Sequence, residues 1–340
     1  MFVILMSAVQ GFWSSMKNVQ NFDQQYLKQL EDIKFQPVFI LGLHRSGTSI
    51  LYKMLAATDG FNPITAYHII EYDKLIDNHI NQREEVAKRE LTESFKEQGL
   101  DDRAIDQLKI NADFAEEYGF LLGQHSSQMY ISPKNLPLFM EMCKKIQFIA
   151  KNNKPILLKN PYDFSNFLYI KKIFPNAKFV FIHRHPLKTL SSAIKAVDVI
   201  MKNKNLYTTK LFRLYNKIFE NPLSLFVVRL CFCRFKELGV IYLTLNSSSD
   251  TSYYLKNIQK LPKKDYVSIN YEDFCKDPQK NMEKILHSLK IKASNKIDFT
   301  NFIKPRKTQL DQSVVRLRKF ICVFMKKYFK HFGYSIDIEI

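Results

Sequence analysis

The chain has 340 residues, 46% of them hydrophobic and 25% charged, so it can bury a large core. Its 51 basic and 33 acidic residues give a net charge of +18, which favours an anionic partner without selecting among nucleic acid, a membrane surface and a charged small molecule. Five cysteines without a CxxC pair predict structural thiols and argue against a disulfide framework or a zinc site. No apolar run is long enough to span a bilayer, so a cytoplasmic location is expected by default.

The predicted elements alternate between strands and helices. Residues 1–36 form a helical lead-in, residues 37–290 the core, and residues 304–331 a basic C-terminal helix. Short apolar runs predict buried strands at 38–41, 155–159, 177–183 and 266–269. A helical insertion covers about 67–150, and 187–262 is mostly helical with a polar loop at 246–252. This order predicts a single α/β domain, over residues 1–340, with a parallel sheet of four to five strands flanked by helices.

The first candidate site follows the first strand, where residues 37–50 read PVFILGLHRSGTSI. A strand, a turn bounded by Gly42 and Gly47, and a helix bring unpaired backbone N–H groups to one point, which attracts anions. The turn adds one cation and three hydroxyls, from Arg45, Ser46, Thr48 and Ser49. We interpret this stretch as a phosphate or sulfate cradle, and the alternative is an ordinary strand-to-helix turn with tolerated glycines.

One substitution separates this cradle from that of the nucleotide triphosphatases. Gly42 and Gly47 have the G-x-x-x-x-G-K-[ST] spacing and Ser49 stands at the hydroxyl position, but Thr48 replaces the lysine. The cation lies inside the turn instead, at Arg45. The pattern therefore argues against ATP or GTP hydrolysis.

The second candidate site lies where residues 181–192 read FIHRHPLKTLSS. Open α/β sheets bind ligands beyond the carboxyl ends of their strands, so Arg184 should lie beside the cradle, with Ser192 two turns into the next helix. A triphosphatase would carry an Asp at this strand end to hold Mg²⁺, and here His183 and Arg184 stand instead. The ligand should thus be bound by protein cations without a metal, unless Arg184 is only a surface ion-pair partner.

Four stretches together resemble the family of sulfotransferases that use 3′-phosphoadenosine 5′-phosphosulfate (PAPS), in the bacterial branch that is similar to tyrosylprotein sulfotransferases. Residues 42–49 resemble the loop that binds the 5′-phosphosulfate, and residues 157–161 (LLKNP) resemble the L-K-[ST]-P stretch. Residues 174–186 with Ser192 resemble the 3′-phosphate motif, and residues 270–278 (NYEDFCKDP) resemble Y-E-D-L…P. The likeness spans about 37–290, and Asn160 departs from it where the family has Ser or Thr.

The resemblance implies a P-loop-like fold and metal-independent, in-line transfer of a sulfuryl group from PAPS to an acceptor hydroxyl. Arg45 and Lys159 would stabilise the leaving phosphate, with backbone or hydroxyl donors from the cradle. Arg184 and Ser192 would hold the 3′-phosphate, and Tyr271 would pack near the adenine. The implied donor-binding set is Arg45, Ser46, Gly47, Thr48, Ser49, Arg184, Ser192 and Tyr271.

The sequence indicates less clearly which residue is the base that takes the proton from the acceptor hydroxyl. In that branch it is a Glu just after the first helix, and in the equivalent stretch, residues 62–71, His68 stands at that place. A histidine is mostly neutral at physiological pH and can accept a proton. Glu71 lies one helical turn further and could serve instead or orient His68. Both stay candidates, as does the interpretation that His68 is only a surface residue.

The acceptor class stays open between a hydroxyl-bearing small molecule, a lipid and a glycan. Two rival functions are a P-loop nucleotide kinase or triphosphatase and a non-enzymatic nucleic-acid binder, for which no helix-turn-helix, zinc or RNA-binding signature is present. In residues 304–331, nine basic residues accompany only one acid, Asp311. An apolar face formed by Val314, Leu317, Ile321, Phe324 and Tyr328 predicts either internal packing or contact with an anionic membrane.

Overall fold

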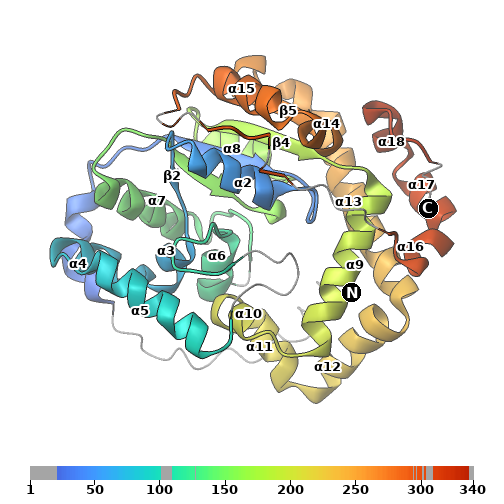
Figure 1. Ribbon diagram of the computed structural model, residues 1–340, viewed down its shortest axis with the longest axis horizontal. Helices are drawn as coiled ribbons and strands as arrows, with labels where there is room; N and C mark the ends of the chain where they lie inside the picture. The colour runs from blue at the N-terminus through green and yellow to red at the C-terminus, as the bar shows by residue number, and fades with distance from the viewer. Residues whose placement is uncertain are drawn as a thin grey trace.

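The centre of the fold is a parallel sheet of five strands in the order β2-β3-β1-β4-β5 (Figure 1). The computed structural model describes residues 21–100, 109–126, 128–293, 295, 297–300, 302–303 and 309–336. The strands are β1 (Pro37–Leu41), β2 (Asn62–Pro63), β3 (Ile156–Lys159), β4 (Lys178–His183) and β5 (Tyr266–Asn270). The predicted α/β class and parallel sheet are confirmed, and the two-residue strand β2 is an addition to the four predicted strands.

Strand β1 lies in the middle of the sheet and is buried on both faces. Its side chains alternate, so that Phe39 and Leu41 join one hydrophobic core and Val38 and Ile40 join the other. This explains why β1 reads as a continuous apolar run, since a central parallel strand meets helices on both sides. Ile40 pairs with Lys159 of β3, and Leu41 pairs with Phe181 of β4. The cradle after β1 therefore starts between the ends of β3 and β4.

Helices cover both faces of the sheet (Figure 1). One face packs against α2 (Thr48–Ala57), α14 (Tyr271–Lys276) and α15 (Pro278–Leu289), which contribute Leu51, Phe274 and Met282 to the core. The other face packs against α7 (Leu136–Ala150), α8 (Phe167–Ile173) and α13 (Lys236–Asn257), which contribute Phe139, Phe167 and Tyr254.

The predicted insertion between the first two predicted strands is helical. Before α7 it contains α3 (Ala66–Ile70), η2 (Tyr72–Lys74), α4 (Leu75–Ile80), α5 (Glu84–Glu97) and α6 (Gly119–His125). Residues 1–20 of the predicted lead-in lie outside the described residues, and its described part contains the 3₁₀ helix η1 (Phe22–Leu30). A fully buried Lys145 ties this helix down, because its Nζ lies 3.0 Å from Asp23 Oδ2 and donates to the Tyr72 carbonyl at 2.9 Å.

The region between β4 and β5 is helical. It consists of α9 (Pro186–Lys202), α10 (Leu206–Leu211), α11 (Arg213–Glu220), α12 (Pro222–Arg229), the π-helical turn η4 (Leu230–Arg234) and α13. The short 3₁₀ turns η3 (Pro161–Asp163), η5 (Ile258–Lys260) and η6 (Lys263–Asp265) connect elements elsewhere.

The predicted polar loop at 246–252 is wrong, because α13 runs through it without a break. Ser and Asn are weak helix formers, but tertiary contacts outweigh that preference here. Ser248 Oγ donates to the Phe324 carbonyl at 2.8 Å, and Ser165 Oγ donates to Asp250 at 2.7 Å. The buried side chain of Thr251 bonds back to the Ser247 carbonyl at 2.7 Å.

The C-terminal stretch differs from the single helix predicted for 304–331. Its described part forms α16 (Gln312–Arg316), α17 (Arg318–Phe324) and α18 (Lys326–Phe332), while residues 304–308 lie outside the described residues. Of the predicted apolar face, Val314, Ile321 and Tyr328 are buried and Phe324 is exposed. The face thus packs mainly against the domain. Within the described chain, no helix has the length and apolar character needed to cross a membrane.

Candidate functional site

The loop between β1 and α2 has a backbone that few residues could adopt. Gly47 caps the start of α2 with φ 104°, and Arg45 has φ 70°, so both lie in the left-handed region. At Gly42 the reason is space, because a Cβ atom would lie 2.5 Å from the Ile182 carbonyl oxygen and 2.6 Å from Ser46 Oγ. The loop therefore wraps tightly over the end of β1 and delivers the first N–H groups of α2 to its open side.

Four residues that the sequence predicts to bind one ligand lie together at this loop. Arg45 Nε donates to Ser192 Oγ on α9 at 3.1 Å, and Arg184 Nη1 donates to the Arg45 carbonyl at 2.9 Å. The Arg184 guanidinium also lies over the ring of Tyr271, 4.5 Å from its centroid. That ring in turn packs against Gly47, where a Cβ would lie 2.7 Å from its Cε2 atom. The ends of β1, β4 and β5 thus join in one cluster.

Two buried polar atoms in this cluster have no hydrogen-bond partner among the described residues. They are Arg184 Nε and Ser46 Oγ. Buried polar groups in proteins are nearly always satisfied, and a ligand with acceptor oxygens in the cradle would satisfy both atoms. Burial raises the pKa of Tyr271 to about 12, so its hydroxyl stays protonated at neutral pH.

Lys159 brings a third cation, after Arg45 and Arg184, to the other side of the cradle. It is the last residue of β3 and is fully buried. Its Nζ donates to Ser49 Oγ, in the first turn of α2, at 3.1 Å. The same Nζ lies 3.3 Å from Oε1 of Glu117, a buried residue just before α6. A lysine and a carboxylate therefore lie side by side at the cradle.

Glu117 is a candidate that the sequence reasoning missed. It follows Glu116 in a segment without any motif, and only the folded chain brings it to Lys159. The exposed rings of His44 and Tyr162 lie nearby, 4.5 Å apart in an edge-to-face contact.

Asn160, the departure from the L-K-[ST]-P stretch, faces away from the cradle. Its side-chain amide donates to the Met129 carbonyl at 2.7 Å and to Asp163 Oδ2 at 2.9 Å. Asp163 also accepts from the Tyr118 hydroxyl at 2.7 Å. This buried network holds the segment that carries Glu117 against the end of β3.

The two residues predicted as the base, His68 and Glu71, make their contacts with neighbouring residues of α3 and η2. His68 is buried, and its Nδ1 accepts a hydrogen bond from the Thr65 N–H at 3.1 Å as part of the N-terminal cap of α3. Burial, and next the charge of Lys88, lower the pKa of His68 to about 4. Glu71 pairs with Lys74 at 3.5 Å. Across the described ranges, no hydrogen bond, ion pair or ring contact joins His68 or Glu71 to the cradle, so their roles stay predictions.

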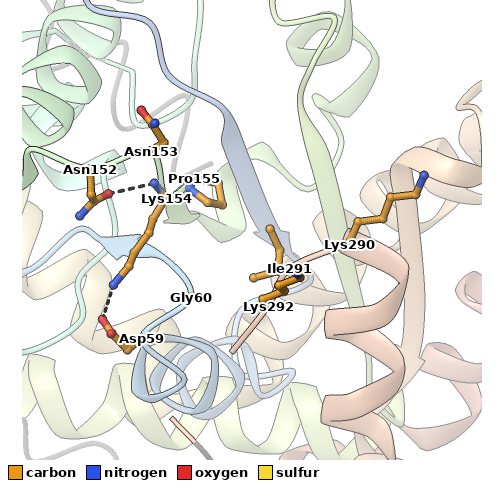
Figure 2. A pocket seen from close by; sticks show the side chains of 9 residues that line it. All are labelled: Asp59, Gly60, Asn152, Asn153, Lys154, Pro155, Lys290, Ile291 and Lys292. Carbon is orange, nitrogen blue, oxygen red and sulfur yellow. Dashed lines mark hydrogen bonds and ion pairs between the residues drawn. The ribbon is translucent and has the colours of Figure 1, made fainter. Parts of the chain in front are cut away.

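A cavity of about 400 Å³ lies away from the cradle, near the amino ends of strands β2 and β3 (Figure 2). Its lining is Asp59, Gly60, Asn152, Asn153, Lys154, Pro155, Lys290, Ile291 and Lys292. Figure 2 shows that the Lys154 side chain is already held by Asp59, at 2.7 Å. None of the predicted site residues borders this cavity, so the candidate site rests on the cradle.

Comparisons with known proteins agree with the fold. A sequence profile described as the sulfotransferase family matches residues 37–227. A search of curated proteins finds no match. Among solved structures, sulfotransferase STF9 from Mycobacterium avium aligns with a TM-score of 0.55 and 13% identity, over 93% of this chain and 81% of that one. Sulfotransferase STF1 from Mycobacterium tuberculosis H37Rv aligns with a TM-score of 0.49 and 16% identity, over 80% and 72%.

Proposed function

The chain belongs to the sulfotransferase family, and from that premise we propose that it transfers the sulfuryl group of PAPS to the hydroxyl of an acceptor. The observation that carries the donor assignment is the cluster of Arg45, Arg184, Ser192 and Tyr271. It adds a second cationic position beside the cradle, suited to a nucleotide with a phosphate at each end of its ribose. ATP has no 3′-phosphate to occupy that position.

The donor contacts follow from the chemistry of each group. The N–H groups of the loop at Gly47, with the hydroxyls of Ser46, Thr48 and Ser49, bind the 5′-phosphosulfate oxygens. Arg184 and Ser192 bind the 3′-phosphate, for which a guanidinium offers paired donors. Tyr271 packs near the adenine. The unpartnered Arg184 Nε and Ser46 Oγ support this fit, because each is a buried donor that a phosphate oxygen would satisfy.

The transfer needs a proton acceptor and a means to stabilise the leaving phosphate. The acceptor oxygen bonds to sulfur while the bond from sulfur to the nucleotide phosphate breaks, and the acceptor proton passes to a base. Arg45 and Lys159 stabilise the charge that grows on the phosphate, the part that Mg²⁺ plays in phosphoryl transfer. We assign the base to Glu117 ahead of His68 and Glu71, because its carboxylate lies 3.3 Å from Lys159 Nζ.

The acceptor is a hydroxyl-bearing small molecule, lipid or glycan, and incubation with labelled PAPS and a panel of the three classes would identify it. A kinase or triphosphatase is disfavoured because Thr48 stands at the position of the P-loop lysine.

The donor assignment is tested by calorimetry with two nucleotides, adenosine 3′,5′-bisphosphate and adenosine 5′-phosphate. The wild-type protein should prefer the bisphosphate, because each charge-assisted hydrogen bond contributes about 1.5–3 kcal/mol, or roughly 10- to 150-fold in affinity. Arg184→Ala should abolish most of that preference. Arg229→Ala is the matched control. Arg229 lies at the end of α12, and like Arg184 it donates to a backbone carbonyl, that of Met201, at 2.8 Å. Equal affinity of the wild-type protein for the two nucleotides would refute the assignment.

A further inference from the structure

The C-terminal helices pack against the same strand end that carries Arg184. Helices α17 and α18 lie against α13, and α17 also contacts α9, the helix that begins just after Arg184 (Figure 1). The chain then passes residues 334 and 335 beside the start of α9. The residues before and after Arg184 are both histidines, and neither has a role in the proposed transfer.

His183, on the amino side of Arg184, is held by α18. Its Nδ1 forms a hydrogen bond of 3.0 Å with the Tyr328 hydroxyl, and its ring stacks on Phe332 with centroids 4.1 Å apart. Both His183 and Tyr328 are buried. Burial raises the pKa of Tyr328 well above its usual value, so its hydroxyl stays protonated and can donate. The Tyr328 hydroxyl thus bonds the residue that directly precedes Arg184.

His185, on the carboxyl side, is held by the residues that follow α18. Its Nε2 lies 2.8 Å from the Ser335 carbonyl oxygen, and its ring meets that of Phe329 edge-to-face at 5.4 Å. Its backbone N–H donates to Glu272 at 3.0 Å. The side chains on both sides of Arg184 are therefore held by residues 328–335.

The Arg184 side chain is held more loosely than its backbone. Its described contacts are one hydrogen bond to the Arg45 carbonyl and the face of Tyr271, while Nε has no hydrogen-bond partner among the described residues. The direction of the guanidinium therefore depends on where the backbone is fixed. We infer that Tyr328 is a positioning residue that acts through His183 and the Arg184 backbone, so that the C-terminal helices set the selectivity for a 3′-phosphorylated nucleotide. This inference rests on the proposed function.

The test uses Tyr328→Phe, which keeps the buried ring and removes the hydroxyl. The readout is the ratio of the affinities for adenosine 3′,5′-bisphosphate and adenosine 5′-phosphate, measured by calorimetry. The ratio should fall by roughly 3- to 10-fold, because one ordinary hydrogen bond contributes about that factor to an equilibrium constant. Tyr215→Phe is the matched control, because Tyr215 is also buried and its hydroxyl bonds the backbone at Ile200 (2.6 Å) and Asn205 (2.7 Å), on α9 and before α10. It should leave the ratio unchanged.

A double-mutant cycle separates positioning from general destabilisation. In the Arg184→Ala background, Tyr328→Phe should change the ratio no further, because the group that it positions is gone. A ratio that stays at the wild-type value in Tyr328→Phe, or equal weakening of both nucleotides, would overturn the inference and leave the proposed function standing. A wild-type protein that binds both nucleotides equally would instead overturn the proposed function, and the inference with it.

Discussion

The buried histidine at the end of β4 should make the protein sensitive to mild acid. His183 is fully buried, and this burial, with a smaller contribution from the charge of His331, lowers its pKa to about 3. In the unfolded chain a histidine titrates near 6.5, so between these values the unfolded state binds a proton that the folded state does not. The contribution to stability is thus complete above pH 6.5 and is lost as the pH falls toward 3.

The magnitude follows from the two pKa values. Between pH 7.5 and pH 5, the proton taken up by the unfolded chain should cost about 2 kcal/mol of the free energy of unfolding. His183→Phe removes the titrating group and keeps an aromatic ring against Phe332. The wild-type protein should therefore lose about 2 kcal/mol more than this variant over that interval.

Urea unfolding followed by circular dichroism at the two pH values measures this difference. His287→Phe, at an exposed position of α15, is the control and should lose as much stability as the wild-type protein. Equal losses in the wild-type protein and His183→Phe would refute the reasoning, because they would mean that His183 is protonated in the folded state near its ordinary pKa.

Two further predictions concern the transfer step. Glu117→Gln should slow single-turnover transfer from labelled PAPS by roughly 10²–10⁴-fold while adenosine 3′,5′-bisphosphate still binds, whereas His68→Gln should keep near-normal turnover. The reverse result would return the role of base to His68, and normal turnover in both variants would direct attention to Glu71. Transfer should also continue in excess EDTA, because the proposed mechanism assigns the role of a divalent metal to Arg45 and Lys159. Activity lost in EDTA and restored by Mg²⁺ would contradict that mechanism.

The strands and the cradle could be predicted because their signals are local. Val38 to Leu41 must be apolar to be buried on both faces, and Gly42 and Gly47 are the residues that the loop geometry requires. Strand β2 gives no such signal, since two residues are too few for a period. The helical state of residues 246–252 depends on contacts such as that of Ser248 with Phe324, which is distant in sequence.

The candidate site likewise contains residues that the sequence predicts and residues that it does not. Arg45, Arg184 and Ser192 follow strand ends or lie on the helix after one, and parallel topology brings such positions together. Glu117 belongs to a segment whose path over β3 is set by the buried Asp163 network, so its sequence neighbours do not reveal its position. His68 stands at the position of the base by likeness to a motif, but in the folded chain its side chain caps the start of α3.

The central place of β1 also has a consequence for how the protein is made. The ribosome produces this strand early, but both of its partners, β3 and β4, come after the long helical insertion. Tyr271 and Tyr328 emerge later still, so at about 5–20 residues per second the cradle waits on the order of 15 s to 1 min for the residues that surround it. For the first part of that time, until β3 and β4 have been made, both edges of an apolar strand stay unpaired, the condition in which nascent chains aggregate. We therefore expect the newly made chain to depend on chaperones until its last helices are released.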